Sequence, residues 1–225
     1  TENQLFDELQ KKEEYIVRDG VIDEEAYNNS ECKLLFILKE VNDPKPTQSW
    51  DLRWELSNND IGSTYTNIAR WIHGIRNRER EIPWEKILEI DHPQKRELLH
   101  SVAVMNVKKT PGKASSNESE LLEWSTGESD LLKKQFREYQ PDLVICCGYS
   151  TSRVVQEINL ISHGEKNPTS RGVWHMPLVP NGHWISYHHP EAHVPDHLLY
   201  YGLVDAVKEI LPISHAGNKI INPSR

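Results

Sequence analysis

The chain has 225 residues, a formal net charge of −8, 37% hydrophobic residues and 27% charged residues. This length suits one domain that buries a full core, and the composition is typical of a globular protein. No run of about 18 apolar residues is present, and the charged start of the chain lacks the apolar centre of a signal peptide. We therefore expect a cytoplasmic monomer that does not contact a membrane.

Short apolar runs alternate with amphipathic segments along the chain. Residues 1–30 predict an N-terminal helical extension, and the polar residues 213–225 predict a loose tail after a single domain that ends at residue 212. The predicted strands lie near 33–38, 101–106, 142–147 and 183–188, and the main predicted helices are 64–75, 128–140, 150–158 and 196–211. This alternation predicts an α/β fold with three layers, α/β/α, around a central, mainly parallel four-stranded sheet.

A polar loop follows each of the four predicted strands: "KEVNDP", "NVKKTPGK", "CGYSTS" and "HHPEAH". In parallel sheets the functional groups sit on loops that leave the carboxyl ends of the strands, so we expect these four loops to form one rim. Neither GxGxxG nor GxxxxGK[ST] is present, which removes the main support for binding of a dinucleotide or a nucleoside triphosphate.

Six of the eleven histidines lie close together near the C-terminus. His189, His193 and His197 are four residues apart, but Pro190 and Pro195 interrupt any helix that would align them. The three cysteines form no CxxC pair. We therefore expect no metal site and no cofactor. His189 differs from the other histidines because the following proline fixes the backbone and orients the ring, although an ordinary loop histidine is the structural alternative.

Acids and amides follow the first two strands. Glu40, Asn42 and Asp43 come after the first strand, where they can orient a water molecule or simply cap the next element. Asn106 ends the second strand, and its amide carries both a donor and an acceptor that can pair with a nucleobase. A buried amide that pairs with the backbone is the alternative for Asn106.

Together these loops resemble the motifs of the uracil-DNA glycosylase superfamily. Members of that family place one motif after the first strand, an asparagine that reads the base at the end of a later strand, and His-Pro-Ser after the last strand. Here "ILKEVNDP", "VAVMNVKKTPGK", "PDLVICCG" and "YHHPEAH" occur in the corresponding order over about residues 30–205.

The resemblance implies a DNA glycosylase that flips a base out of DNA and hydrolyses its N-glycosidic bond. The product would be uracil or a modified, enlarged pyrimidine, with an abasic site left in the DNA, in repair or in defence against modified foreign DNA. His189 would stabilise the negative charge on the departing base, and Asn106 would hold the base edge. Glu40, Asn42 or Asp43 would occupy the water-activating place.

Further contacts follow from the same resemblance. Trp50, Trp54 or Tyr65 would stack on the flipped base, although ordinary packing is the alternative for each. Residues 191–197 would lie near the minor groove of the DNA. Phosphates would be gripped by basic side chains that are otherwise solvated surface: Arg70, Arg76, Lys108, Lys109 and Lys113.

The chain also departs from the family pattern. Lys39 replaces the usual glycine, Glu191 stands where the family has serine, and the iron–sulfur cysteines of some branches are absent. These differences concern the identity of the substrate more than the fold. Two other classes remain open: a metal-dependent hydrolase that uses the histidine-rich segment 175–197, and a non-catalytic nucleic-acid-binding module.

Overall fold

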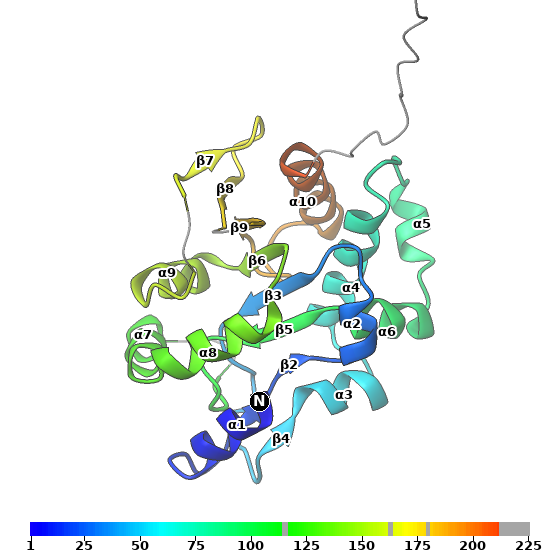
Figure 1. Ribbon diagram of the computed structural model, residues 1–225. Helices are drawn as coiled ribbons and strands as arrows, with labels where there is room; N and C mark the ends of the chain where they lie inside the picture. Colours follow the sequence, from blue (N-terminus) through cyan, green and yellow to red (C-terminus); the bar gives the residue numbers. More distant parts are fainter. Residues whose placement is uncertain (114–116, 162–163, 179–180, 212–225) are drawn as a thin grey trace, which may run out of the picture.

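A seven-stranded mixed sheet forms the centre of the computed structural model, which describes residues 1–113, 117–161, 164–178 and 181–211 (Figure 1). The strand order is β2-β5-β3-β6-β9-β8-β7. The four central strands are parallel: β5 (Ala103–Asn106), β3 (Leu34–Leu38), β6 (Leu143–Cys147) and β9 (His183–Tyr187). These are the four strands expected from the sequence, so the prediction of a parallel centre is confirmed.

The prediction of only four strands is wrong, because short antiparallel strands extend both edges of the sheet. β2 (Gly20–Val21) pairs with β5 at one edge. At the other edge β8 (Trp174–Pro177) pairs with β9, and β7 (Asn167–Pro168) pairs with β8. β2 and β7 have only two residues each, which is too short for a periodic pattern, so only pairing with a neighbour defines them.

The central strands are buried on both faces, which explains their continuous apolar sequences. Every residue of β3, β5 and β6 is buried. Side chains alternate between two cores: Phe36 and Ile145 enter one, and Ile37 and Val144 enter the other. A sheet with two apolar faces needs a helical layer on each, which is the arrangement in Figure 1.

Helices from both halves of the chain cover the two faces. The first core is closed by α3 (Leu52–Asn58), α4 (Ser63–Arg76), α5 (Trp84–Leu88), α6 (His92–His100) and α10 (Asp196–Ile210). The second is closed by α1 (Glu2–Gln10), α2 (Glu24–Asn28), α7 (Glu118–Gly127), α8 (Ser129–Tyr139) and α9 (Tyr149–Glu157). The three-layer arrangement is therefore as expected. None of the helices in the described ranges is long and apolar enough to cross a membrane.

The N-terminal segment is not the helical extension that the sequence predicts. Only α1 and the short α2 are helical, while β1 (Val17–Arg18) pairs with β4 (Trp50–Asp51) and β2 joins the main sheet. Phe6 and Leu9 of α1 are fully buried in the second core. The segment is thus part of the domain. The predicted tail, 213–225, lies outside the described residues.

The strand order creates a switch point between β3 and β6. From β3 the chain continues to β5 on one side, and from β6 it continues to β9 on the other side. In open α/β sheets, ligands bind outside the carboxyl ends of the strands at such a point. The loops after β3, β5, β6 and β9 are therefore where a functional site is expected.

Candidate functional site

His189 lies on the loop after β9, close to the loop after β6. A Cβ atom placed on Gly148, the first residue after β6, would lie 3.9 Å from the Cβ of His189. The N–H of Gly148 donates to the carbonyl of Tyr187 at 2.8 Å, which keeps the two strand ends paired. Gly148 has a φ of 107°, a conformation that favours glycine. Its backbone therefore turns sharply into α9 beside His189.

The hydrogen bond at Nδ1 defines the tautomer of His189. The backbone N–H of Glu191 donates to Nδ1 at 3.1 Å, so Nδ1 is an acceptor and the neutral ring carries its proton on Nε2. Partial burial lowers the pKa of His189, and the positive charge of Lys39 lowers it further, while Glu191 acts in the opposite direction. The half-buried imidazole is thus a neutral N–H donor at neutral pH.

Helix α4 holds the loop that carries His189. The Asn67 side chain donates to the carbonyl of Pro190 at 2.9 Å and to Asp196 at 3.3 Å. Arg70 donates to Asp196 at 3.2 Å and stacks over the ring of Trp84, and its side chain is only 14% exposed. The prediction that Arg70 grips phosphate is therefore not supported, because its guanidinium is committed to the loop.

A cavity of about 380 Å³ lies between the loop after β3 and the loop after β5. It brings together four of the predicted site residues: Glu40, Asp43, Lys108 and Lys113. Lys108 Nζ contacts Glu40 Oε2 at 2.8 Å and Glu120 at 2.6 Å. These two ion pairs hold Lys108 inside the protein, with a side chain 7% exposed, so it does not serve as a surface phosphate contact as predicted.

Of the three polar residues predicted to act on water after β3, only Glu40 and Asp43 line the cavity. Asn42 is exposed, and its backbone forms a bridge with Gly112. Asp43 lines the cavity and accepts a hydrogen bond from the indole N–H of Trp50 at 3.3 Å. Trp50 and Tyr65 are half-buried against the first core, and Trp54 is exposed on α3. Stacking of a base on any of these rings stays a prediction.

Asn106 is buried and its amide is already paired. Its side chain is 2% exposed, and its backbone N–H and Nδ2 both donate to Asp19 Oδ2, at 2.7 and 3.0 Å. Asn106 and His189 do not face each other from adjacent strand ends, because β3 and β6 lie between β5 and β9. Asn106 is thus a buried, paired amide, as in its alternative role, but its side chain pairs with the carboxylate of Asp19 and not with the backbone.

Lys109 completes a fully buried ion pair with the same acid. Lys109 Nζ contacts the two carboxylate oxygens of Asp19 at 2.7 and 2.9 Å, and both side chains are 0% exposed. The prediction that Lys109 binds phosphate is therefore wrong. Nothing in the sequence pattern singles out Asp19, which lies in the short N-terminal segment "VRDGV".

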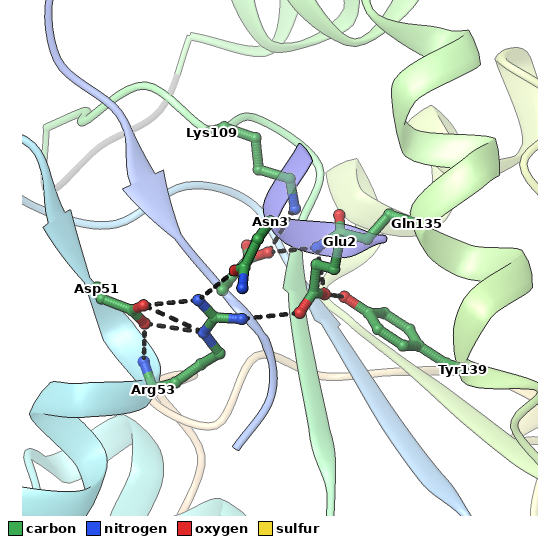
Figure 2. Close-up of polar contacts among 8 residues, drawn as sticks. Glu2, Asn3, Asp51, Arg53, Lys109, Gln135 and Tyr139 are labelled. Carbon is green, nitrogen blue, oxygen red and sulfur yellow. Dashed lines mark hydrogen bonds and ion pairs between the residues drawn. The ribbon is translucent and has the colours of Figure 1, made fainter. Parts of the chain in front are cut away.

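Further polar residues extend this buried cluster to α1, α3 and α8 (Figure 2). Gln135 donates to Asp19 at 2.9 Å and to Glu2 at 3.1 Å. Arg53 donates to Glu2 at 2.8 Å, and the Tyr139 hydroxyl also donates to Glu2. Burial raises the pKa of Glu2, although the hydrogen bonds from Tyr139 and Gln135 oppose the shift. The cluster joins segments that are distant along the chain, which indicates a role in stabilising the fold.

Two basic residues near the rim were not selected from the sequence. Lys39 directly follows β3 and lies close enough to His189 to lower its pKa. Lys45 is exposed on the loop that borders the cavity. Their position after the first predicted strand is the signal in the sequence that could have identified them.

The histidine-rich segment does not gather its side chains around one point. The rings of His175 and His183 face each other with centroids 5.9 Å apart, while His188, His193 and His197 are exposed. Within the described ranges, no group of three or more histidine, cysteine, aspartate or glutamate side chains is arranged to hold a metal ion. Metal content stays a prediction for elemental analysis.

No family model matches the chain, and a search of curated proteins finds no match. The resemblance to the uracil-DNA glycosylase superfamily therefore stays a prediction that depends on the order of the four motifs.

Proposed function

We propose that the protein is a DNA glycosylase that hydrolyses the N-glycosidic bond of uracil or a modified pyrimidine. The observation that carries this proposal is His189, a neutral imidazole with its proton on Nε2, at the carboxyl end of a central parallel strand. The acids of the cavity, Glu40 and Asp43, follow β3 on the same rim. The target base must leave the DNA stack to reach such a rim, at a cost of a few kcal/mol.

The role of His189 follows from the charges that the reaction creates. Breaking the bond leaves negative charge on the base and positive charge on the sugar. A preorganised N–H donor aimed at the developing anion contributes about 2.7–4 kcal/mol to stabilisation of the transition state. The Nε2–H group is suited to this task because the hydrogen bond at Nδ1 already sets its tautomer.

Glu40 and Asp43 are the proposed partners of water and of the sugar cation. Glu40 Oε2 accepts from Lys108, and Oε1 has no hydrogen-bond partner within the described part of the chain. A carboxylate oxygen that is held in place but still unpaired can accept a proton from a water molecule. Asp43 offers a second carboxylate that lines the same cavity.

The phosphate contacts need a different set of residues from the predicted one. Lys108 and Lys109 are paired with acids inside the protein, whereas Lys45 and Lys113 are exposed and Lys39 is half-buried beside His189. We assign phosphate binding to these three lysines, since salt-sensitive phosphate contacts supply most non-specific affinity for DNA. Asn106 has a structural role in this proposal, and no reader of the base edge is assigned.

The test is base release under single-turnover conditions. Single-stranded and duplex DNAs that carry uracil, 5-substituted pyrimidines or only normal bases are incubated with excess protein, and mass spectrometry detects free base and abasic sites. We expect release from at least one substrate, and its loss in His189→Gln but not in His188→Gln, a matched change at the exposed neighbouring histidine. Tight binding of every DNA without release would refute the proposal and favour a binding module. Activity that disappears with a chelator would favour a metal-dependent hydrolase.

A further inference from the structure

Glu191 ties the loop of His189 to the first turn of α4. Its carboxylate accepts hydrogen bonds from the hydroxyls of Ser63 and Thr64. Both hydrogen bonds lower the pKa of Glu191, and the one from Ser63 has the largest effect. Helix α4 follows Gly62, which offers no side-chain cap. An anion from another loop is therefore bound by the side-chain hydroxyls of the first two helical residues, at the positive end of α4.

The backbone of Glu191 acts on His189 through a single peptide unit. The N–H of this unit belongs to Glu191 and donates to Nδ1 of His189 at 3.1 Å. Its carbonyl belongs to Pro190 and accepts from the Asn67 side chain at 2.9 Å. In a trans peptide the N–H and the C=O point in opposite directions, so a hydrogen bond at one end orients the group at the other end.

Both flanks of this peptide unit are thus attached to α4. Asn67 holds the carbonyl, and the Glu191 carboxylate, one residue further along, is held by the first-turn hydroxyls. The N–H of Ala192 also donates to the carbonyl of His189 at 2.9 Å, which closes the turn. If the carboxylate were removed, the peptide plane would keep only one of its two attachments to α4.

We infer that Glu191 is a positioning residue that keeps Nδ1 of His189 an acceptor and so keeps the proton on Nε2. The catalytic meaning of this inference rests on the proposed function, but the geometric claim does not. Glu191 stands where the family that the chain resembles has serine. By this inference its side chain contributes to the function of the site. A serine would not bring an anion to α4 or to the imidazole.

The two charged groups that act on His189 are Lys39 and Glu191. Removal of the Glu191 charge leaves Lys39 unopposed, which lowers the pKa of His189 further. Removal of the whole carboxylate also frees the loop. These two consequences are separable by substitution.

The experiment compares three variants of the full chain. Glu191→Gln keeps the shape and one acceptor oxygen but removes the charge. Glu191→Ala removes both. The double variant Ser63→Ala/Thr64→Val removes the partner hydroxyls and leaves residue 191 intact. Nitrogen NMR of the imidazoles reports the tautomer and the pKa of His189, and His189→Gln identifies its signals.

We expect the wild type to show the Nε2–H tautomer alone. Glu191→Ala and the double variant should both show a mixture of tautomers, with base release slowed about 10- to 100-fold by the misplaced ring. Glu191→Gln should keep most of the Nε2–H tautomer but lower the pKa of His189. If Glu191→Ala does not fold, the double variant decides, because its substitutions are at the surface end of α4 and leave the core unchanged.

The outcomes separate the two proposals. An unchanged tautomer in every folded variant overturns the role of Glu191, whatever the activity. A changed tautomer in a protein whose wild type releases no base supports the role of Glu191 in positioning His189 and refutes the glycosylase proposal instead.

Discussion

The loop after β9 and the loop after β5 both present polar residues at the end of a buried strand, but their surroundings differ. In the first loop, His189 receives one hydrogen bond at Nδ1 and keeps Nε2 for another partner. In the second, Asn106 and Lys109 are both paired with Asp19. A polar side chain at a strand end is therefore a candidate for catalysis only when the fold leaves one of its donors or acceptors both unused and accessible.

The difference is also one of energy. A buried ion pair such as that of Asp19 and Lys109 compensates the desolvation of two charges, and removal of one partner leaves the other charge buried and alone. A half-buried loop histidine carries no such penalty. The loop after β5 should therefore respond to mutation in stability, and the loop after β9 should respond in rate.

The largest expected effect is on stability. Lys109→Ala should lower the free energy of unfolding by about 3–5 kcal/mol, because Asp19 is left as an uncompensated buried charge. Urea unfolding followed by circular dichroism measures this loss. Lys113→Ala, at an exposed lysine of the same loop, is the matched control and should change stability by less than about 0.5 kcal/mol. A loss below about 1 kcal/mol in Lys109→Ala would contradict a structural role for the pair.

The next effect is on the chemistry at the cavity. Glu40→Gln or Asp43→Asn should slow base release by about 100-fold or more, because a positioned carboxylate is lost from the reaction of water. Single-turnover release measures the rate, and Asn42→Ala, at the exposed residue of the same loop, should retain it. Full activity in both acid variants would remove the carboxylates from the proposed mechanism.

The pH dependence of base release tests the protonation state of His189. Because burial and Lys39 lower the pKa of His189 below its ordinary value of 6.5, the neutral form should persist to mildly acidic pH. The rate should fall as the pH drops through this lowered pKa, since a proton on Nδ1 would face the N–H donor of Glu191. Rates measured between about pH 5 and pH 8 give the profile.

The same shift predicts a change in stability. A histidine with a lowered pKa in the folded state contributes stability that is present above pH 6.5 and is lost as the pH falls through its folded pKa. His189→Gln should therefore show a flatter dependence of unfolding free energy on pH. Equal slopes in the two proteins would contradict the lowered pKa.

The smallest effect concerns Glu2 in the buried cluster. Its raised pKa means that its contribution to stability is fully present below its ordinary value of 4.5 and is lost as the pH rises through the folded pKa. Relative to Glu2→Gln, the wild type should gain stability on acidification from neutral pH towards 4.5. Parallel urea titrations at both pH values measure the gain, and a loss in its place would reverse the assigned shift.

The candidate site could be predicted only in part from the sequence. The position of His189 was predictable, because a proline follows it at the end of an apolar strand. The roles of Lys108 and Lys109 were not, since a lysine in a polar loop gives the same signal whether it meets solvent or a buried acid. Lys109 pairs with Asp19, which is distant along the chain, and Lys108 pairs with Glu120, which lies on helix α7.

Local patterns were enough to place the four parallel strands and helices α4, α8, α9 and α10, because a strand buried on both faces needs a continuous apolar run and an amphipathic helix needs a repeat near 3.6 residues. They were not enough for β2 or for the buried cluster around Asp19. Both features depend on pairing between segments far apart in the chain, where the energy of a hydrogen bond or a charge is set by the partner and its burial. Only the folded chain therefore assigns Asn106 to the interior and leaves the Nε2–H of His189, at the rim, without a hydrogen-bond partner among the described residues.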